Sequence, residues 1–168
     1  MIQKSLTGLI KEMEYLTNHS VEIGILAIDK EKKGNDGETT ILEYAVYNEF
    51  GTKHIPARPF MRNAVEDNSE NIDSYIEKRI EAVLESQITG RVALMQIGEY
   101  IRGLIIQSIA TATNWATPLS SKTLKAKLKK GSNNDKTLIE DRFLIRSIRY
   151  QIVSKKGKID YLSNFKEV

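Results

Sequence analysis

The sequence predicts an α+β fold: a small antiparallel sheet packed with several helices, including a long central helix. Three observations lead to this fold class. Apolar side chains recur at helical spacing over much of the chain, most regularly in residues 91 to 111. Residues 20 to 28 and 146 to 153 instead alternate apolar and polar side chains, as strands do. With 168 residues, 40% of them hydrophobic, the chain can form a single domain, residues 1 to 168, with a modest core.

The first forty residues predict a helix, a strand and a loop. One face of an N-terminal helix in residues 1 to 19 carries Ile2, Leu6, Leu9, Ile10, Met13 and Leu16. The strand in residues 20 to 28 places on one face Val21, Ile23, Ile25 and Ala27. Residues 29 to 40 hold no apolar side chain, so we expect them to form an exposed, mobile loop.

A short helix is predicted over residues 41 to 50. Thr40 and Glu43 match a capping box directly before the apolar run. The side chains expected to face inward are Leu42, Ala45 and Val46. Gly51 stands where a helix C-terminal glycine belongs, because only glycine takes the left-handed conformation at little cost.

The middle of the chain predicts two further helices. Pro59 suits the first position of a helix that runs to about residue 87, with a bend or interruption at "EDNSEN". Gly90 marks a break before the long central helix in residues 91 to 111. The apolar and small residues of its stripe are Leu94, Ile97, Gly98, Ile101, Leu104, Ile105, Ser108 and Ile109.

The last fifty residues are basic and mixed in structure. We expect a turn at Pro118, a serine cap at position 120 or 121, and a short basic helix that ends between Lys130 and Gly131. Further expected segments are a flexible loop (131 to 136), a turn or short helix (138 to 144) and the strand of residues 146 to 153 with Ile148, Tyr150 and Ile152 on one face. In residues 154 to 168 we expect a hairpin strand, with Ile159 and Tyr161 paired to that strand, and then a tail.

Composition excludes several classes of function. The sequence has no cysteine, and its two histidines, His19 and His54, lie far apart, so we expect no disulfide and no zinc site. No apolar run is long enough to predict a membrane span. Neither a glycine-rich phosphate loop nor a nucleophile elbow is present, so we expect no cofactor. A cytoplasmic or virion location fits these features.

The charge is uneven along the chain. Residues 1 to 117 carry 12 Lys/Arg and 17 Asp/Glu (12 − 17 = −5), while residues 118 to 168 carry 13 and 5 (13 − 5 = +8). This asymmetry favours either a basic face that meets an anionic partner or a basic end that is simply solvated. The candidate DNA-facing residues are Lys122, Lys125, Lys127, Lys129 and Lys130. A nucleic-acid-binding protein that uses this region is the alternative function.

The stretch "YAVYNEFGTKHIPARPFMR", residues 44 to 62, is the most distinctive in the sequence. Pro56 and Pro59 fix their own φ angles and make the segment stiff and extended. Glu49 is a natural ion-pair partner for Arg58 or Arg62. The side chain of Asn48 can form a hydrogen bond with the backbone of the same turn. The segment either serves folding alone or also presents a rigid surface to neighbouring subunits. A hydrolase that uses Glu49 and His54 is a weaker hypothesis, since His54 has no evident orienting partner.

These residues resemble a known motif. The stretches "YAVYNEFGT" and "IPARPFMR" are similar to the signature of the tail-completion, or head–tail joining, proteins of tailed bacteriophages and prophages. The matching positions are Ala45, Asn48, Glu49, Phe50, Gly51, Thr52, Ile55, Pro56, Arg58, Pro59 and Phe60. A second block matches at Gly98, Pro118, Leu119, Thr123, Lys127, Leu138, Ile139, Leu144, Ser147, Ile148 and Tyr150. The family often has a turn glycine before its final strand, where this chain has "EDRFL".

The resemblance covers about residues 20 to 153 and implies a structural virion protein rather than an enzyme. It implies a place at the neck or the head-proximal end of the tail, as a ring of copies. The implied partners are other neck and tail proteins (a connector, a tail terminator or the tail tube), with non-specific DNA contact and no membrane. The structural motif and interface would be ten of the matched positions of the first block, all of them except Ala45.

Overall fold

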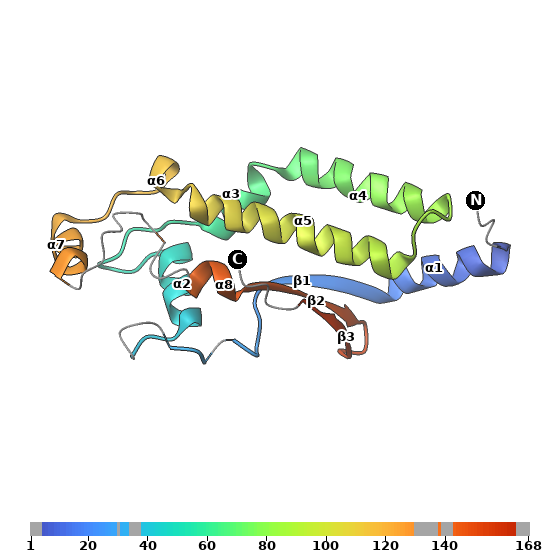
Figure 1. Ribbon diagram of the computed structural model, residues 1–168, viewed down its shortest axis with the longest axis horizontal. Coiled ribbons are helices and arrows are strands. Elements are labelled where there is room, and N and C mark those ends of the chain that lie inside the picture. Colours follow the sequence, from blue (N-terminus) through green and yellow to red (C-terminus); the bar gives the residue numbers. More distant parts are fainter. Residues whose placement is uncertain (1–4, 30, 34–37, 130–137, 139–142, 164–168) are drawn as a thin grey trace. The chain divides into compact units, whose positions relative to one another are not determined.

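The computed structural model of the protein describes residues 5–29, 31–33, 38–129, 138 and 143–163. These residues form eight helices and a three-stranded antiparallel sheet (Figure 1). The predicted α+β class is therefore confirmed. In chain order the elements are α1 (Leu6–Asn18), β1 (His19–Ile25), α2 (Ile41–Phe50), α3 (Phe60–Glu66), α4 (Ser69–Leu84), α5 (Gly90–Ala110), α6 (Ala112–Trp115), α7 (Ser121–Lys129), α8 (Phe143–Ser147), β2 (Ile148–Ser154) and β3 (Ile159–Leu162).

The chain divides into two compact units. The first unit comprises the described residues within Met1–Gly24, Asn68–Gly103 and Arg149–Val168. The second comprises those within Ile25–Asp67 and Leu104–Ile148. That residues 1 to 168 behave as a single domain stays a prediction.

The sheet has the strand order β1-β2-β3. β2 and β3 pair in antiparallel register, with Ile152 opposite Tyr161 and Val153 opposite Ile159. The predicted hairpin is therefore confirmed, as is the inward face of the strand, where Ile148, Tyr150 and Ile152 are buried. The predicted start at residue 146 is wrong, because helix α8 continues to Ser147 and the strand begins at the next residue.

The first strand is shorter than the sequence predicts. It ends at Ile25 rather than at residue 28. The chain turns directly afterwards, where the N–H of Asp29 donates to the carbonyl of Leu26 at 2.9 Å. Ala27 is consequently exposed instead of sharing an inner face with the strand residues.

Helix α1 begins at Leu6, capped by the side chain of Ser5. The predicted apolar face is only partly covered, since Leu6 is 75% and Ile10 is 50% exposed. The middle of α1 contacts the start of α5, where the Gly90 N–H donates to the Glu12 carboxylate at 2.8 Å. α1 then passes directly into β1, so that no loop separates the helix from the sheet.

Helices α4 and α5 form an antiparallel pair and lie side by side in Figure 1. The rings of Tyr75 and Tyr100 stack between them with centroids 4.2 Å apart, and Arg79 Nη1 donates to Gln96 Oε1 at 3.0 Å. The α5 stripe predicted from the sequence is buried or half-buried along its whole length. α4 ends at Leu84, before the predicted residue 87, because Ser86 takes a positive φ of 60°.

In the second unit the predicted helix in residues 41 to 50 is confirmed. Thr40 and Glu43 form the capping box: the Thr40 N–H donates to Glu43 Oε2 at 2.9 Å, and the Glu43 N–H donates to Thr40 Oγ1 at 3.2 Å. Pro59 precedes α3 rather than beginning it, because the first helical residue is Phe60. The predicted interruption before α4 is confirmed at Asp67 and Asn68. The fully buried core side chains of this unit are Phe60, Ile109, Ala112 and Ile148.

Other predictions in this unit have mixed outcomes. The side chain of Ser120 accepts the Thr123 N–H at 3.2 Å, which confirms a serine cap on α7. The region 29 to 40 is not uniformly exposed, because Asp29 is fully buried, and Lys33 and Thr40 form an isolated β-bridge. Residues 30 and 34–37 of this loop lie outside the described residues, as do the loop at 131 to 136, residues 139–142 and the tail from 164.

Candidate functional site

The corner between α2 and α3 holds most of the predicted site residues. Two polar side chains of α2, Asn48 and Glu49, turn inward and are only 5% and 8% exposed. The apolar residues Ile41 and Ala45 share their side of the helix and are also buried. Buried polar groups need partners, so the contacts of Asn48 and Glu49 show what fixes the corner.

Glu49 caps helix α3 from the neighbouring helix. Its two carboxylate oxygens accept the backbone N–H groups of Met61 and Arg62, each at 3.0 Å. Pro59 provides no side-chain cap to α3, so Glu49 satisfies N–H groups that otherwise lack an acceptor. A negative charge at a helix N-terminus is also favourable.

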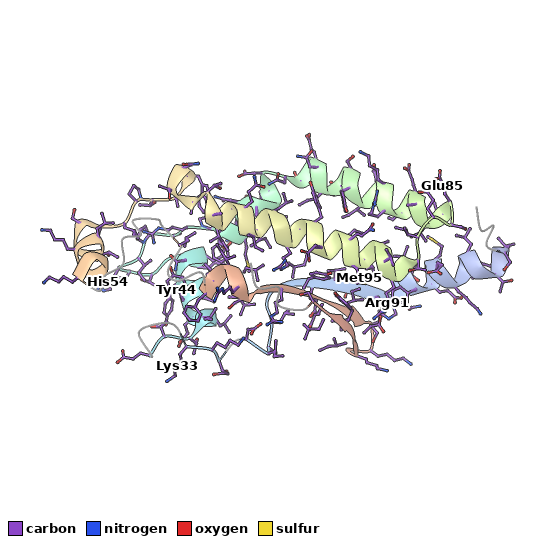
Figure 2. The ribbon with its side chains drawn as sticks, in the orientation of Figure 1. Lys33, Tyr44, His54, Glu85, Arg91 and Met95 are labelled. Carbon is purple, nitrogen blue, oxygen red and sulfur yellow. The ribbon has the colours of Figure 1, made fainter. Side chains whose placement is uncertain are left out.

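The predicted ion pair of Glu49 with Arg58 or Arg62 is therefore wrong. Both carboxylate oxygens bond the backbone of α3, and the contact of the Arg62 guanidinium is instead with the ring of Phe50, 5.9 Å from its centroid. These bonds also count against Glu49 as a general base, because both of its carboxylate oxygens already accept hydrogen bonds from the α3 backbone. His54, the other residue of the hydrolase hypothesis, is exposed (Figure 2).

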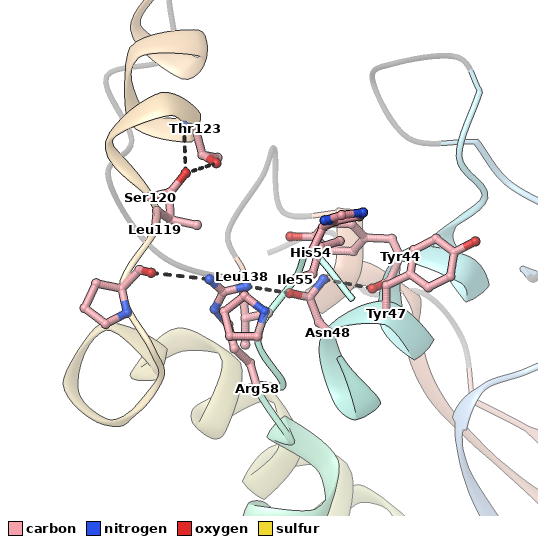
Figure 3. Close-up of a pocket in the computed structure, with 12 residues that line it drawn as sticks. Tyr44, Tyr47, Asn48, His54, Ile55, Arg58, Leu119, Ser120, Thr123 and Leu138 are labelled. Carbon is pink, nitrogen blue, oxygen red and sulfur yellow. Dashed lines mark hydrogen bonds between the residues drawn. The ribbon is translucent and has the colours of Figure 1, made fainter. Parts of the chain in front are cut away.

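Arg58 ties the corner to the segment before α7 (Figure 3). Its Nε donates to the carbonyl of Thr117 at 2.9 Å and its Nη2 to the carbonyl of Pro118 at 3.5 Å. Its Nη1 donates to Asn48 Oδ1 at 3.3 Å, and its backbone N–H donates to the Asn48 carbonyl at 2.6 Å. These contacts leave Arg58 only 5% exposed. Burial lowers the pKa of Arg58, and the nearby Tyr44 partly opposes this.

The turn that follows α2 depends on Gly51. Its φ of 74° and ψ of 173° lie in a region that is almost restricted to glycine. A Cβ at this position would also lie 2.9 Å from the Ala57 nitrogen. The next residue, Thr52, closes the turn: its N–H donates to the Ile55 carbonyl at 2.8 Å, and its Oγ1 accepts the His54 and Ile55 N–H groups at 3.2 and 3.0 Å.

The outward side of α2 is largely apolar. Its exposed apolar residues are Leu42 (39%), Val46 (41%), Tyr47 (40%) and Phe50 (66%), and the charged residue Glu43 is also exposed there. The prediction that Leu42 and Val46 face inward is wrong, whereas that for Ala45 is confirmed. Helix α2 therefore buries one carboxylate and one amide side chain beside two apolar ones, and it leaves four apolar side chains exposed, which is unusual for a surface helix.

The matched residues of the first block divide by role. Asn48, Glu49, Arg58 and Phe60 are buried and hold the corner together. Gly51, Ile55 and Pro59 are half-buried, while Thr52 and Pro56 are exposed in the turn. Phe50 is the most exposed aromatic residue of the outward face.

A pocket lies between this corner and the first turn of α7 (Figure 3). Its volume is about 300 Å³. The lining residues are Tyr44, Tyr47, Asn48, His54, Ile55, Pro56, Arg58, Pro118, Leu119, Ser120, Thr123 and Leu138. Residues from both blocks of the motif, among them Arg58, Pro118 and Leu119, thus meet at one cavity.

Four of the five predicted DNA-facing lysines belong to α7. Lys125 and Lys129 are exposed on this helix. The backbone of Lys122 and Lys127 is also helical, and Lys130 lies outside the described residues. The nine residues of α7 therefore contain four lysines and no acidic residue.

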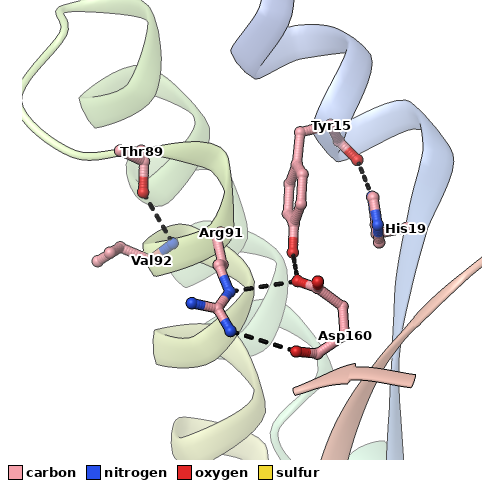
Figure 4. Close-up of polar contacts among 6 residues, drawn as sticks. All are labelled: Tyr15, His19, Thr89, Arg91, Val92 and Asp160. Atoms are coloured by element: carbon pink, nitrogen blue, oxygen red, sulfur yellow. Dashed lines mark hydrogen bonds and ion pairs between the residues drawn. The ribbon is translucent and has the colours of Figure 1, made fainter. Parts of the chain in front are cut away.

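One polar cluster was not predicted from the sequence (Figure 4). In the first unit, Tyr15 donates a hydrogen bond to Asp160, and Arg91 Nε pairs with the same carboxylate at 3.2 Å. Burial and then the Asp160 bond raise the pKa of Tyr15 to about 12. The Tyr15 bond lowers the pKa of Asp160. The ring of His19 stacks on that of Tyr15 at 3.9 Å.

Comparison with known proteins adds no assignment: no family model, curated protein or solved structure matches the chain. Within the described residues, no group of three or more His, Cys, Asp or Glu side chains is arranged to hold a metal ion. The helices in this part of the chain include none with both the length and the apolar character needed to cross a bilayer.

Proposed function

We propose that this chain is a structural protein of a tailed-bacteriophage virion that completes the tail or joins the tail to the head at the neck. It acts by assembling into a ring and docking onto neighbouring neck or tail proteins, such as a connector, a tail terminator or the tail tube. It has no catalytic role. It resides in the host cytoplasm before assembly and in the virion afterwards.

The outward apolar face of α2 is the observation that carries this proposal. Leu42, Val46, Tyr47 and Phe50 are between 39% and 66% exposed on one short helix. Apolar residues gathered on one helix face favour burial against another protein. Aromatic residues such as Tyr47 and Phe50 are typical of the centre of protein interfaces.

The rigidity of the corner also supports a docking role. Glu49 and Arg58 bond α3 and the segment before α7 from the inside, while the apolar side chains stay outside. A surface held in its binding conformation loses little conformational entropy when a partner docks. The resemblance of this same segment to phage tail-completion proteins gives the partner class.

The direct test is deletion of the gene from the phage or prophage that encodes this chain. We expect filled heads and separate tails in electron micrographs of the lysate, and restored joining when the gene is supplied on a plasmid. Joined, infectious particles produced without the gene would refute the proposal.

Point variants test the outward face of α2 itself. We expect the double variant Val46→Asp/Phe50→Asp to fold, because both side chains are exposed, but to leave heads and tails unjoined in the complementation assay. Leu6→Asp is a matched control, since Leu6 is 75% exposed on α1. Normal joining by the double variant would show that this face is not an interface.

The alternative, a nucleic-acid-binding protein, is favoured by the four lysines of α7. It predicts DNA affinity that falls steeply with salt. Replacing Lys125, Lys127, Lys129 and Lys130 with glutamine should then abolish function as well as DNA binding. If the quadruple variant still supports virion assembly, this alternative is excluded.

A further inference from the structure

The pocket beside the α2–α3 corner contains a buried positive charge. Its volume of about 300 Å³ is at the lower end of the range for ligand sites, so it suits one or two side chains rather than a large cofactor. Arg58 lines this pocket and is only 5% exposed. A guanidinium in such a place needs compensation, because burying a charge is costly unless it is paired.

The partners of Arg58 within the described residues are all neutral. They are the carbonyl oxygens of Thr117 and Pro118 and the amide oxygen of Asn48. A guanidinium has five N–H groups, so these three bonds leave two (5 − 3 = 2). The buried acidic residue of the corner, Glu49, instead accepts hydrogen bonds from the N–H groups of Met61 and Arg62. The charge of Arg58 is thus hydrogen-bonded but not neutralised by this part of the chain.

The other walls of the pocket combine an electrostatic potential that favours an anion with apolar surface. Ser120 and Thr123 belong to the capped first turn of α7, whose N-terminus carries a partial positive charge. Ile55 and Leu119 are aliphatic, and the rings of Tyr44 and Tyr47 come from α2. A ligand that fits all these walls has an anionic group next to an apolar one.

We propose that this pocket binds an acidic peptide segment of a partner protein, with a Glu or Asp carboxylate on Arg58 and a neighbouring aliphatic side chain against Ile55 and Leu119. The planar guanidinium matches a carboxylate, and the charge-assisted bond is stronger than those to neutral carbonyls. Tyr47 belongs both to this pocket and to the outward face of α2, so a partner on that face can also enter the pocket. The inference goes beyond the proposed neck function, because it assigns a peptide-binding site to the pocket. That site can be tested on the purified chain, without virion assembly.

Two capped tripeptides test the charge requirement. Acetyl-Leu-Glu-Leu-amide and acetyl-Leu-Gln-Leu-amide differ only in the carboxylate. They are titrated into the ¹⁵N-labelled full chain while amide and arginine Nε–H shifts are followed. We expect saturable shifts at Arg58, Ser120 and Thr123 with the Glu peptide, and binding about tenfold weaker with the Gln peptide. Equal affinity for the two peptides, or no saturable shift with either, overturns the proposal.

Variants test the role of Arg58. We expect Arg58→Gln to abolish the preference for Glu, and Arg58→Lys to retain only part of it, because lysine lacks the planar fork. Arg62→Gln is a matched control, since Arg62 lies on the same segment but does not line the pocket. If Arg58→Gln does not fold, Tyr47→Ala is the substitute, because Tyr47 is 40% exposed and its loss should weaken peptide binding while the fold persists. Unchanged Glu-peptide binding in the folded variants counts against the site.

A DNA oligonucleotide supplies the competing anion. A twelve-base single strand, titrated at matched ionic strength, should leave the Arg58 Nε–H signal unshifted. If the DNA strand shifts that signal and displaces the Glu peptide, the pocket binds phosphate groups and the proposal is overturned. All these readouts use the purified chain and not virion assembly. Loss of peptide binding and failure of the neck proposal can therefore be told apart.

Discussion

Gly98 of α5 lies directly against the ring of Tyr150 of β2. A Cβ at position 98 would come within 2.4 Å of Tyr150 Cδ2 and 2.8 Å of Cγ. The long helix can therefore pack closely on the sheet only because this residue has no side chain. Tyr150 is itself 4% exposed, so its ring has little room to move aside.

Gly98→Ala should lower stability. Alanine normally stabilises a helix interior by roughly 0.5–1 kcal/mol relative to glycine. Here the forced contact with the Tyr150 ring should outweigh this gain, at about 1–3 kcal/mol for an overpacked core. Gly103→Ala is the matched control, because nothing lies within 4 Å of a Cβ there, and it should be stabilising. Urea unfolding of both variants measures the difference, and equal effects would show that α5 does not contact Tyr150 in this way.

Glu49→Ala should destabilise the second unit. The substitution leaves the N–H groups of Met61 and Arg62 without their acceptors, and loss of a helix N-terminal cap costs about 0.5–2 kcal/mol. Glu66→Ala, at the exposed end of the same helix, should stay within about 0.5 kcal/mol of the parent protein. Chemical denaturation measures both. A Glu49 variant as stable as the Glu66 variant would contradict the capping role.

Gly51→Val should cost on the order of 1 kcal/mol or more, because the residue needs a positive φ. Part of the cost should come from the Ala57 backbone nitrogen, which would lie 2.9 Å from the Cβ of any side chain at position 51. Gly157→Val separates the cost of the positive φ from the cost of the steric contact. Gly157 has a φ of 77° but open space where its Cβ would lie. We expect a larger drop in Tm for Gly51→Val than for Gly157→Val. The reverse order would mean that the turn after α2 can rearrange.

High pH should weaken the first unit through Tyr15. Its pKa is raised from 10.0 to about 12, so between these values the unfolded chain has lost the proton that the folded chain keeps. The unfolded state binds fewer protons there, so stability falls as pH rises through this window. Tyr15→Phe lacks this contribution and should show a shallower decline in urea midpoint between about pH 9 and pH 12. Tyr47→Phe, on the outward face of α2, is the control, and parallel curves for all three proteins would contradict the prediction.

Local patterns in the sequence were sufficient to predict most of the helices and strands. The capping box of Thr40 and Glu43 placed α2 with its observed ends, and the stripe of α5 predicted both its length and its buried side. The alternation around Tyr150 and Ile152 likewise predicted the buried face of β2. These features depend on neighbours within a few residues, which is why they can be read from the chain itself.

The contacts of the candidate site could not be predicted in the same way. α2 has apolar residues on both sides, so its pattern does not show whether Val46 or Asn48 faces inward. Asn48 and Glu49 are buried because the folded chain supplies their partners, and Arg58 meets Thr117 across 59 positions of sequence. Nothing in the local composition indicates such a pair. The Tyr15–Asp160 bond joins positions even farther apart, 145 residues from each other.

The cap that Glu49 places on α3 also affects how this part of the molecule opens. α3 has seven residues, too few for a helix that is stable by itself in water. Because its first amides are held by a residue of α2, the two helices are expected to open together as one cooperative unit. Solvent exchange at the Met61 and Arg62 amides would then report the release of α2, so slow exchange there would be a measure of how long the outward apolar face keeps its orientation.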